Sequence, residues 1–531
     1  MKEGFRQAMA WLHTWIGLLF GWLLFAIFLT GTMSYFDAEI SHWSQPEIPL
    51  RPLDSGASVE LAQGYLQQHA NAASRWFIGL PDERAPALSV MWQNPGKPGE
   101  RGTFVRKLLD PQTGAEVQAR KSLGGEFFYR FHFQLQMPYP WGRWLSTAAA
   151  MVMFVALISG IIIHKKIFKE FFTFRPRKGQ RSWLDGHNAV GVLVLPFHLM
   201  ITYSSLVIFM SMVMPAGILA GYGDRPQGFF NEVLPVSDAP EAAGQPGTLA
   251  PFGPMLEQAR QAWNGAEVGQ VEVYHPGDRN ASVSLLRRSS DGVIYDPGTG
   301  LLLQGSSGQV LSATTLGSWP MRIAGGFYGL HMGHFATPIL RWLYFFCGLA
   351  GTAMIGSGLV IWLGKRQLKH AGTAVLPFEL RLVEVLNIAG MAGLVVAVGG
   401  FFWANRLLPV ALAGRAGWEV NAFFIAWALM LVHAVWRRGR RAWVEQLGLA
   451  ALLFAGLPLL DALTTDGNPW RYLLRGDWLM LGFDLAFVGC AGLFAWAAWK
   501  VRRAGLPKDS TIARRERVRP ARTGALEAEM N

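Results

Sequence analysis

Cysteine is scarce in this sequence, with two residues in a chain of 531. Cys347 and Cys490 both lie inside apolar stretches, and they form no Cys-x-x-Cys pair, no zinc-ligand spacing and no Cys-x-x-Cys-His motif. Such motifs are typical of disulfide frameworks, metal sites and covalently attached haem. Their absence argues against disulfide stapling, iron–sulfur clusters and covalent haem.

Motifs for nucleotides and activated nucleophiles are missing as well. The sequence has no Walker loop, no Gly-x-Gly-x-x-Gly between a strand and a helix, and no Gly-x-Ser-x-Gly. The first two motifs bind phosphates through a glycine-rich backbone, and the third exposes a catalytic serine. We therefore expect no site for a nucleotide, a flavin or a serine nucleophile, and a redox protein of this kind would take its electrons from a quinol or from another protein.

Charged residues make up only 16% of the chain, whereas 51% is hydrophobic, with 22 Trp and 34 Phe. Such a composition is too apolar for an ordinary soluble enzyme of this length. The net charge of +12 comes largely from short basic runs beside apolar segments, at 164–166, 175–178, 365–366, 437–441 and 502–503. Runs placed in this way are typical of the cytoplasmic loops of membrane proteins. We therefore exclude nucleic acid as a partner.

Eight segments have the roughly 20 apolar residues that a transmembrane helix needs: 12–36, 143–164, 187–213, 338–363, 381–404, 418–436, 445–464 and 478–500. The first is longer than the core of a signal peptide, so we interpret it as a retained helix. A cytoplasmic amino terminus places every basic run on the cytoplasmic side. We therefore expect a multi-pass protein in a lipid bilayer, with both termini cytoplasmic.

Two long polar regions, 37–142 and 214–337, fall on the periplasmic side in this topology. Each has a helix-like stretch followed by strand-like alternation of apolar and polar residues. Each also contains an Asp-Pro-x-Thr-Gly turn, at 110–114 and at 296–300. Both regions are interpreted as small α+β modules.

The modules belong to a predicted internal repeat of helix, periplasmic module and helix. Unit one covers 1–170 and unit two covers 181–366, and five features recur in the same order at near-equal spacing. Because each unit contains two spans, the copies are expected to be parallel, related by an axis along the membrane normal. Residues 381–500 add a four-helix membrane bundle, and 501–531 form a basic cytoplasmic tail. The predicted fold is an all-α membrane bundle with two small α+β periplasmic modules.

Histidines occupy matching positions in the two units. His13 and His187 each begin a His-x-x-x-Gly motif at the cytoplasmic end of a helix. The glycine lies one turn deeper on the same face and leaves room for a flat macrocycle. Each histidine alone is equally explained as a residue that solvates a helix end. As a symmetric pair on neighbouring helices, they favour the two axial ligands of a haem iron.

A second matched pair lies on the periplasmic side. His132 ends Phe-Tyr-x-Phe-His and His331 ends Phe-Tyr-x-Leu-His, with His334 as a rival ligand one turn later. Arg143 and Arg341 follow these histidines. Guanidinium groups suit carboxylates, so haem propionates are candidate partners. Anchoring at the membrane surface is the alternative for both arginines.

Two further histidines lie near membrane depth without a symmetric partner. His198 follows His187 by eleven residues, which on one straight helix is about 16 Å along the same side. That spacing suits two stacked haems, and a hydrogen-bonded core histidine is the equal alternative. His164 lies at a cytoplasmic helix edge and is interpreted as interfacial, with haem ligation as its rival role.

Three acidic residues in the last four helices lie at membrane depth or near its border: Glu384, Asp461 and Asp484. Acidic side chains at that depth are candidates for quinol or proton handling.

In combination, these motifs resemble the PepSY-associated transmembrane family. The resemblance covers about 1–366 and rests on the two His-x-x-x-Gly motifs, Leu29-Thr30-Gly31, the two Asp-Pro-x-Thr-Gly turns and the Ser-Gly ends of the second and fourth helices. It implies PepSY-like modules and haem b, one or two per chain, with axial ligands at His13, His132, His187 and His331. The sequence departs from the family pattern at 202–205, where a close-packing glycine is missing, and by its extra bundle.

Some members of the family are ferric-siderophore reductases, so the resemblance implies electron transfer to Fe(III) in the periplasm. We expect reduction of the Fe(III)-siderophore to release Fe(II), because hard oxygen donors bind Fe(II) more weakly. A quinol or a redox protein is the expected electron donor. The alternative is a non-enzymatic PepSY protein that binds periplasmic partners or regulates proteases. An iron or small-solute transporter ranks third, because the sequence shows no obvious broken helix and no midplane charge cluster.

Overall fold

The computed structural model describes residues 3–51, 54–96, 102–164, 179–233, 239–296, 298–315, 318–370 and 375–504. The predicted basic tail from 505 onward and the basic residues at 165–166 and 175–178 lie outside these ranges. Within them, seven helical segments are long and apolar enough to cross a membrane: α1 (Glu3–Ser34), α5 (Trp141–Ile163), α14 (Pro338–Lys369), the continuous α15 (Phe378–Asn387), η1 (Ile388–Gly393) and α16 (Leu394–Leu407), α17 (Arg415–Arg437), α18 (Gly439–Thr464) and α20 (Trp478–Arg503). The pair α7 (Gln180–Leu193) and α8 (Leu195–Ile208) makes an eighth if it counts as one span. The prediction of about eight membrane helices is confirmed.

The third predicted span, 187–213, is broken. α7 and α8 meet at Val194 with a bend of 67°. Pro196 lies in the first turn of α8, where a helix does not use the N–H group that proline lacks. In the interior of one long helix, the same proline would remove a backbone hydrogen bond and clash with the preceding turn. Two expectations are therefore wrong. His187 and His198 do not share one straight helix, and the chain does contain a broken membrane helix.

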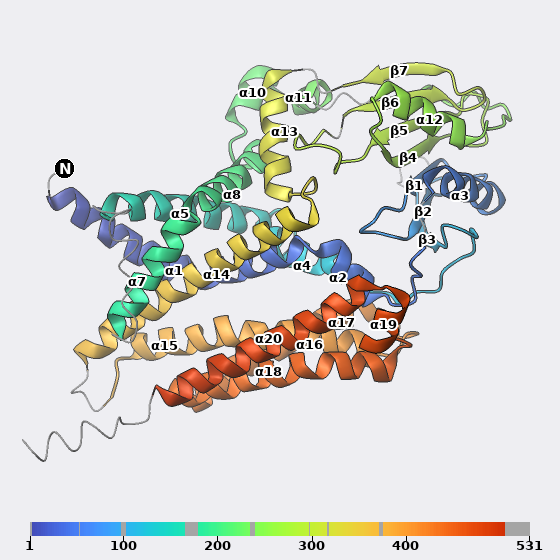
Figure 1. Cartoon of the computed structure of the whole chain (residues 1–531). Coiled ribbons are helices and arrows are strands. Elements are labelled where there is room, and N and C mark those ends of the chain that lie inside the picture. Colours follow the sequence, from blue (N-terminus) through green and yellow to red (C-terminus); the bar gives the residue numbers. More distant parts are fainter. Residues whose placement is uncertain are drawn as a thin grey trace, which may run out of the picture.

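The membrane helices of the two predicted units are interleaved (Figure 1). α1 packs against α5 and α14, α7 packs against α14, and α8 packs against α5. Small residues permit the close approach of α14 to α1, since Gly348 faces Thr32 and Gly351 faces Phe28. This interleaving brings residues from both units to the same places in the membrane core.

The two inserts share one sheet instead of forming the two separate modules that we expected. Its seven antiparallel strands run in the order β3-β2-β1-β4-β5-β6-β7. Arg75 of β1 lies opposite Tyr274 of β4, and Arg75 Nη2 donates to Glu272 Oε2 at 2.6 Å. Pairing β1 with β4 removes the exposed edge that each insert would otherwise leave. The strands are β1 (Arg75–Gly79), β2 (Leu88–Gln93), β3 (Phe104–Leu109), β4 (Val268–Tyr274), β5 (Ser282–Arg287), β6 (Gly300–Gln304) and β7 (Val310–Thr314).

Two helices cover one face of the sheet. α3 (Ser55–His69) and α12 (Phe252–Ala262) pack together over the alternating buried positions of the strands, among them Trp76, Ile78 and Val271. The sheet therefore has one apolar core of its own, and it lies at one end of the membrane helices (Figure 1). We call that end the sheet side and the opposite end the distal side.

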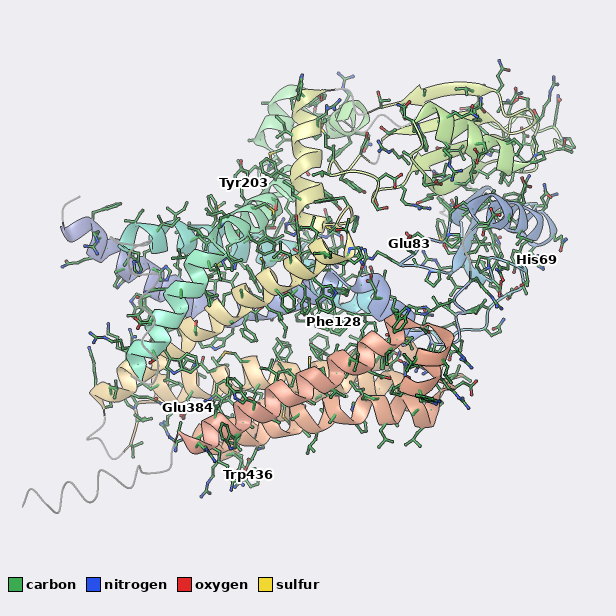
Figure 2. The ribbon with its side chains drawn as sticks, in the orientation of Figure 1. His69, Glu83, Phe128, Tyr203, Glu384 and Trp436 are labelled. Carbon is green, nitrogen blue, oxygen red and sulfur yellow. The ribbon has the colours of Figure 1, made fainter. Side chains whose placement is uncertain are left out.

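Short helices link the membrane helices to the sheet: α2 (Asp37–Ser44), α4 (Gly125–Gln134), α9 (Met210–Val213), α10 (Ala216–Tyr222), α11 (Pro226–Val233) and α13 (Trp319–Met332), with α19 (Pro469–Arg475) inside the bundle. α4 is held between α1 and the bundle, because its buried Phe127, Phe128 and Phe131 pack on Phe401 and Phe423. Figure 2 shows Phe128 in this interior position. The bundle at 381–500 therefore supports a helix of the first unit.

A buried charged network fixes the sheet-side end of the bundle to the first insert. Arg406 Nε lies 2.7 Å from Asp461 Oδ1, and neither side chain is more than 1% exposed. The Tyr472 hydroxyl donates to Asp461 Oδ2 at 2.5 Å, and the Arg406 guanidinium lies 3.6 Å from the ring centre of Trp43 in α2. Asp461, a candidate for quinol or proton handling in the sequence, thus has an arginine as its partner.

Candidate functional site

The structure brings His13 of α1 and His187 of α7 together on the distal side. Their ring centres are 6.4 Å apart and their planes are nearly perpendicular, at 81°. His13 and His187 lie on different helices. They meet because α1 and α7 both pack against α14. We call these two residues the distal pair.

Each ring of the distal pair is oriented by the last membrane helix of its own predicted unit. His13 Nδ1 donates to the Ala156 carbonyl of α5 at 3.0 Å, and His187 Nδ1 donates to the Met354 carbonyl of α14 at 2.9 Å. A serine hydroxyl lies near each Nδ1 as well, at 3.2 and 3.1 Å (Ser159 and Ser357). A carbonyl accepts only, so Nδ1 carries the proton and Nε2 keeps a free lone pair.

The second pair, His132 of α4 and His331 of α13, lies on the sheet side with ring centres 6.1 Å apart and planes tilted by 35°. His132 Nδ1 donates to the Ile27 carbonyl of α1 at 2.8 Å. His331 Nδ1 lies 2.9 Å from the Ser204 hydroxyl, which itself donates to the Ile201 carbonyl at 3.1 Å and so accepts from the ring. We call these residues the sheet-side pair.

Both rings of the sheet-side pair are neutral. Burial lowers the pKa of His132, and burial together with the neighbouring His132 lowers the pKa of His331 to about 3. Neutral imidazole is the form that binds a metal ion. The sheet-side pair therefore offers two free nitrogen lone pairs at physiological pH.

The ring spacing of both pairs suits one shared metal ion. An imidazole nitrogen binds a metal at about 2.0 Å and lies about 1.1 Å from its ring centre, so two axial imidazoles place their ring centres about 6.3 Å apart. The observed values are 6.4 and 6.1 Å. Among the described residues, no group of three or more His, Cys, Asp and Glu side chains gathers as a metal site. Two imidazoles instead fit a metal whose other four ligands come from a macrocycle.

Each pair lines a cavity of its own. The distal cavity has a volume of about 610 Å³, and the sheet-side cavity has a volume of about 490 Å³. Leu24 and Met153 line both, so the two cavities meet near these side chains. The Ile27 carbonyl, which accepts the hydrogen bond from His132, belongs to the same helix α1 as His13 and lies 14 residues after it. At 1.5 Å per residue, the two positions are about 21 Å apart along the helix axis. The pairs thus form two layers across the membrane.

The two predicted arginines have different positions. Arg143 lines the sheet-side cavity, with its guanidinium over the rings of Phe133 and Tyr139. Arg341 instead donates from Nη1 to Glu39 Oε1 at 2.8 Å and is not among the residues that line the cavity. Its charge is already compensated by a carboxylate. The contacts of Arg341 therefore favour a role in binding Glu39, and its predicted role at a haem propionate stays a prediction.

Sequence reasoning missed the basic residues of the distal cavity. Lys365, Arg366 and Lys369 of α14 line it, and Arg366 lies 3.7 Å from the ring centre of Trp362. These cations suit carboxylates at the membrane surface. The sequence carried the signal, since the run at 365–366 follows the predicted span 338–363 in the same unit as His187, but we interpreted it only as evidence of topology.

The remaining histidines take three different places. His164 lines the distal cavity and His334 lines the sheet-side cavity. Burial lowers the pKa of His334, and no contact between its ring and those of the sheet-side pair is seen in the described part of the chain. His198 is fully buried and lines neither cavity. Of the histidines that were candidates for haem ligands, only those of the distal and sheet-side pairs have another histidine ring beside them among the described residues.

The carboxylate of Glu39 connects the sheet to the membrane helices. Arg84, on the loop between β1 and β2, donates from Nε and Nη2 to the two oxygens of Glu39 in α2, both at 2.8 Å. Arg341 of α14 binds the same carboxylate. Figure 2 shows Glu83 on this loop, on the side of the sheet toward the membrane helices. Glu39 thus joins three parts of the chain.

We expect Arg84→Ala to loosen this connection. A bidentate charge-assisted bond contributes about 1.5–3 kcal/mol, so hydrogen–deuterium exchange in residues 80–87 should accelerate by at least about tenfold. Arg51→Ala is the control, because the Arg51–Asp110 pair lies within the sheet unit and is 41% exposed on the arginine side. Equal exchange at 80–87 in wild type and Arg84→Ala would show that the loop is held by other contacts.

Comparisons with known proteins identify a family that this chain matches over most of its length. Residues 10–365 match the sequence model of a family described as the PepSY-associated TM region. An uncharacterized protein of Pseudomonas aeruginosa is 25% identical over 395 residues, which cover 72% of this chain and 96% of that protein. The family match includes all four paired histidines and ends within α14.

Proposed function

Since the chain belongs to the PepSY-associated TM region family, we propose that it is a b-type haem protein that passes electrons across a bacterial inner membrane to ferric iron held by a siderophore. The observation that supports this most directly is the pair of histidine layers, with ring centres 6.4 and 6.1 Å apart. Two layers about 21 Å apart along α1 give a route between the two membrane surfaces.

In this proposal, the four histidines act as axial ligands and the helix backbone orients them. Carbonyls of Ala156, Met354 and Ile27 and the Ser204 hydroxyl hold the Nδ1 protons, which leaves each Nε2 lone pair available to a metal ion. Such outer contacts set ring orientation and raise ligand basicity. Bound haem would supply reversible one-electron chemistry at its iron.

The charged residues of each cavity would receive the haem carboxylates. Arg143 takes this role on the sheet side, and Lys365, Arg366 and Lys369 take it on the distal side. All four lie near helix ends, where a carboxylate keeps contact with water while the macrocycle stays in the apolar interior. The same cations hold the macrocycle at a fixed depth.

The sheet side would be periplasmic and would hold the ferric substrate. Tyr328 lines the sheet-side cavity one turn before His331, and Tyr295 of the second insert stacks on it with ring centres 4.2 Å apart. This aromatic contact leads from the sheet-side pair to the sheet. A quinol from the bilayer or a redox protein would supply electrons at the distal pair, and release of Fe(II) would follow from its weaker binding to hard oxygen donors.

An optical spectrum of the purified full-length protein tests this proposal. We expect b-type bands of bis-histidine haem that sharpen on dithionite, with two haems per chain. His13→Ala and His187→Ala should each remove one haem, whereas His164→Ala, in the same cavity, should retain both. A colourless preparation, or full haem content in both ligand variants, would contradict the proposal.

Transport of iron or a small solute is a second candidate, because α7 and α8 form the kind of broken helix that transporters use. Reconstituted vesicles distinguish the two functions. A haem protein of the proposed kind should reduce an external Fe(III)-siderophore when dithionite is trapped inside, without accumulating the siderophore. Accumulation without reduction would favour transport. A protein that only regulates a periplasmic partner should show neither reduction nor accumulation of the Fe(III)-siderophore.

A further inference from the structure

His198 of α8 is a fully buried imidazole that the proposed haem sites do not use. Within the described residues, neither ring nitrogen makes a hydrogen bond of good geometry, and the backbone of Cys347 in α14 lies near enough to interact weakly with the ring. The desolvation of a polar group without a partner costs about 1–3 kcal/mol. Buried histidines therefore keep such an arrangement only where a bound water or a function offsets that cost.

A second polar group without a partner lies one turn further along the same helix face. Thr202 is 4% exposed, and its hydroxyl makes no hydrogen bond among the described residues. Unlike His198, Thr202 lines the sheet-side cavity. The two side chains are spaced i and i+4 on α8, so they are neighbours on its surface. Together they form a polar step that leads from the cavity down to the buried imidazole.

The neighbouring helices leave room for this imidazole. A β-carbon added at Gly351 of α14 would lie 3.0 Å from His198 Nε2, and the ring of Phe28 in α1 meets the imidazole edge-on with centres 6.3 Å apart. The offset that relates His13 to His187 places Leu24 and Phe28 of unit one at the positions of His198 and Thr202. The polar step is thus confined to unit two.

We propose that His198 is a proton-binding site that takes up one proton when the sheet-side pair's iron takes up one electron. This inference rests on the proposed function and deepens it. The electron comes from the quinol or redox protein, and the proton comes from hydronium in the solvent that enters the cavity. The Thr202 hydroxyl gives its proton to the imidazole and takes one from hydronium, so one O–H bond of hydronium breaks and neutral water remains. One N–H bond forms on the imidazole, so the added positive and negative charges cancel within the apolar interior.

The surroundings explain why protonation would follow the electron. α14 presents Cys347 and Tyr344 toward this region, α13 presents His331, and α5 presents Arg143 at its sheet-side end. The titratable side chains of α1 lie at its distal end, and α9 has none. None of these groups is a carboxylate, and Asp37, which does line the sheet-side cavity, pairs with Arg84 at 3.2 Å. A cationic imidazole here would be an uncompensated buried charge, unless an electron arrives beside it.

The test is a spectroelectrochemical titration of the haem-loaded, full-length protein at several pH values. In the wild type, the midpoint potential of one haem should fall by about 59 mV for each tenfold drop in proton concentration, the value for one proton per electron. His198→Leu, which installs the residue of unit one, and His198→Gln, which stays polar but takes no proton, should both remove this slope. His69→Leu, a histidine on α3 outside the membrane, should retain it.

Each outcome supports or overturns the inference. Loss of the slope in the His198 variants, with both haems bound, supports it. A wild type whose two potentials do not change with pH overturns it and leaves the haem proposal standing, as does a slope that persists in His198→Gln. If His198→Leu fails to fold, the glutamine variant decides. A wild type without haem overturns both proposals.

Discussion

Gly31→Ala is expected to abolish haem binding at the sheet-side pair and to leave the distal pair loaded. A β-carbon built at Gly31 of α1 overlaps the imidazole of His132, whose Nδ1 is held by the Ile27 carbonyl on the same helix. α4 cannot move away to make room, because Phe127 and Phe128 pack it against the bundle. A displacement of the ring by about 1 Å is enough to lose a metal bond of about 2 Å.

The measurement is haem per protein, with the spectrum of the remaining haem as a second readout. We expect a fall from two haems to one, and an unchanged spectrum for the distal haem. Gly4→Ala on the same helix is the matched control, because a β-carbon there meets nothing within 4 Å. Two haems in Gly31→Ala would mean that His132 is not an axial ligand in the orientation described.

Asp461→Ala is expected to destabilise the protein by about 3–5 kcal/mol, because Arg406 loses its ion-pair partner and the nearby buried Asp484 makes no hydrogen bond to it among the described residues. Arg406 has no exposed surface to turn toward, and Tyr472 loses its acceptor at the same time. The thermal unfolding midpoint in detergent should fall by more than about 6 °C. The network also joins the bundle to α2 through Trp43, so exchange in α2 should accelerate as well.

The matched control is Glu445→Ala in the same helix, α18. Glu445 pairs with Arg437 at 2.8 Å, but both side chains are more than a third exposed, and exposed pairs contribute at most about 1 kcal/mol. The two carboxylate deletions should therefore differ severalfold in their effect. Equal shifts would show that the bundle is held by its aromatic core alone.

The helix content of the chain could be predicted because the signal is local. A run of about 20 apolar residues specifies a membrane helix whatever surrounds it, and the spans recur in the structure as α1, α5, α14 and the helices after 378. The break at Val194 was missed although Pro196 marks it, because one proline is compatible with both a kinked helix and two helices. Strand-like alternation predicted the strands of the inserts, but alternation does not say which strand pairs with which.

The candidate site could be predicted residue by residue, but not as a geometry. Matching motifs singled out His13, His187, His132 and His331, whereas the distances between their rings depend on how α1, α7, α4 and α13 pack. The ion pair of Arg341 could not be predicted for the same reason. Its neighbour in space is Glu39, more than 300 residues earlier in the chain, and no sequence pattern links the two.

The scarcity of cysteine and charge, together with the long apolar runs, determined a membrane protein, its approximate number of spans and the histidines worth considering, because composition and hydropathy act through each segment's own solvation. Only the tertiary structure decided that the histidines stand in two pairs, that both inserts share one sheet, and that His198 is fully buried beside α14. Those facts depend on contacts between segments far apart in the chain, whose free energy arises only when the helices pack.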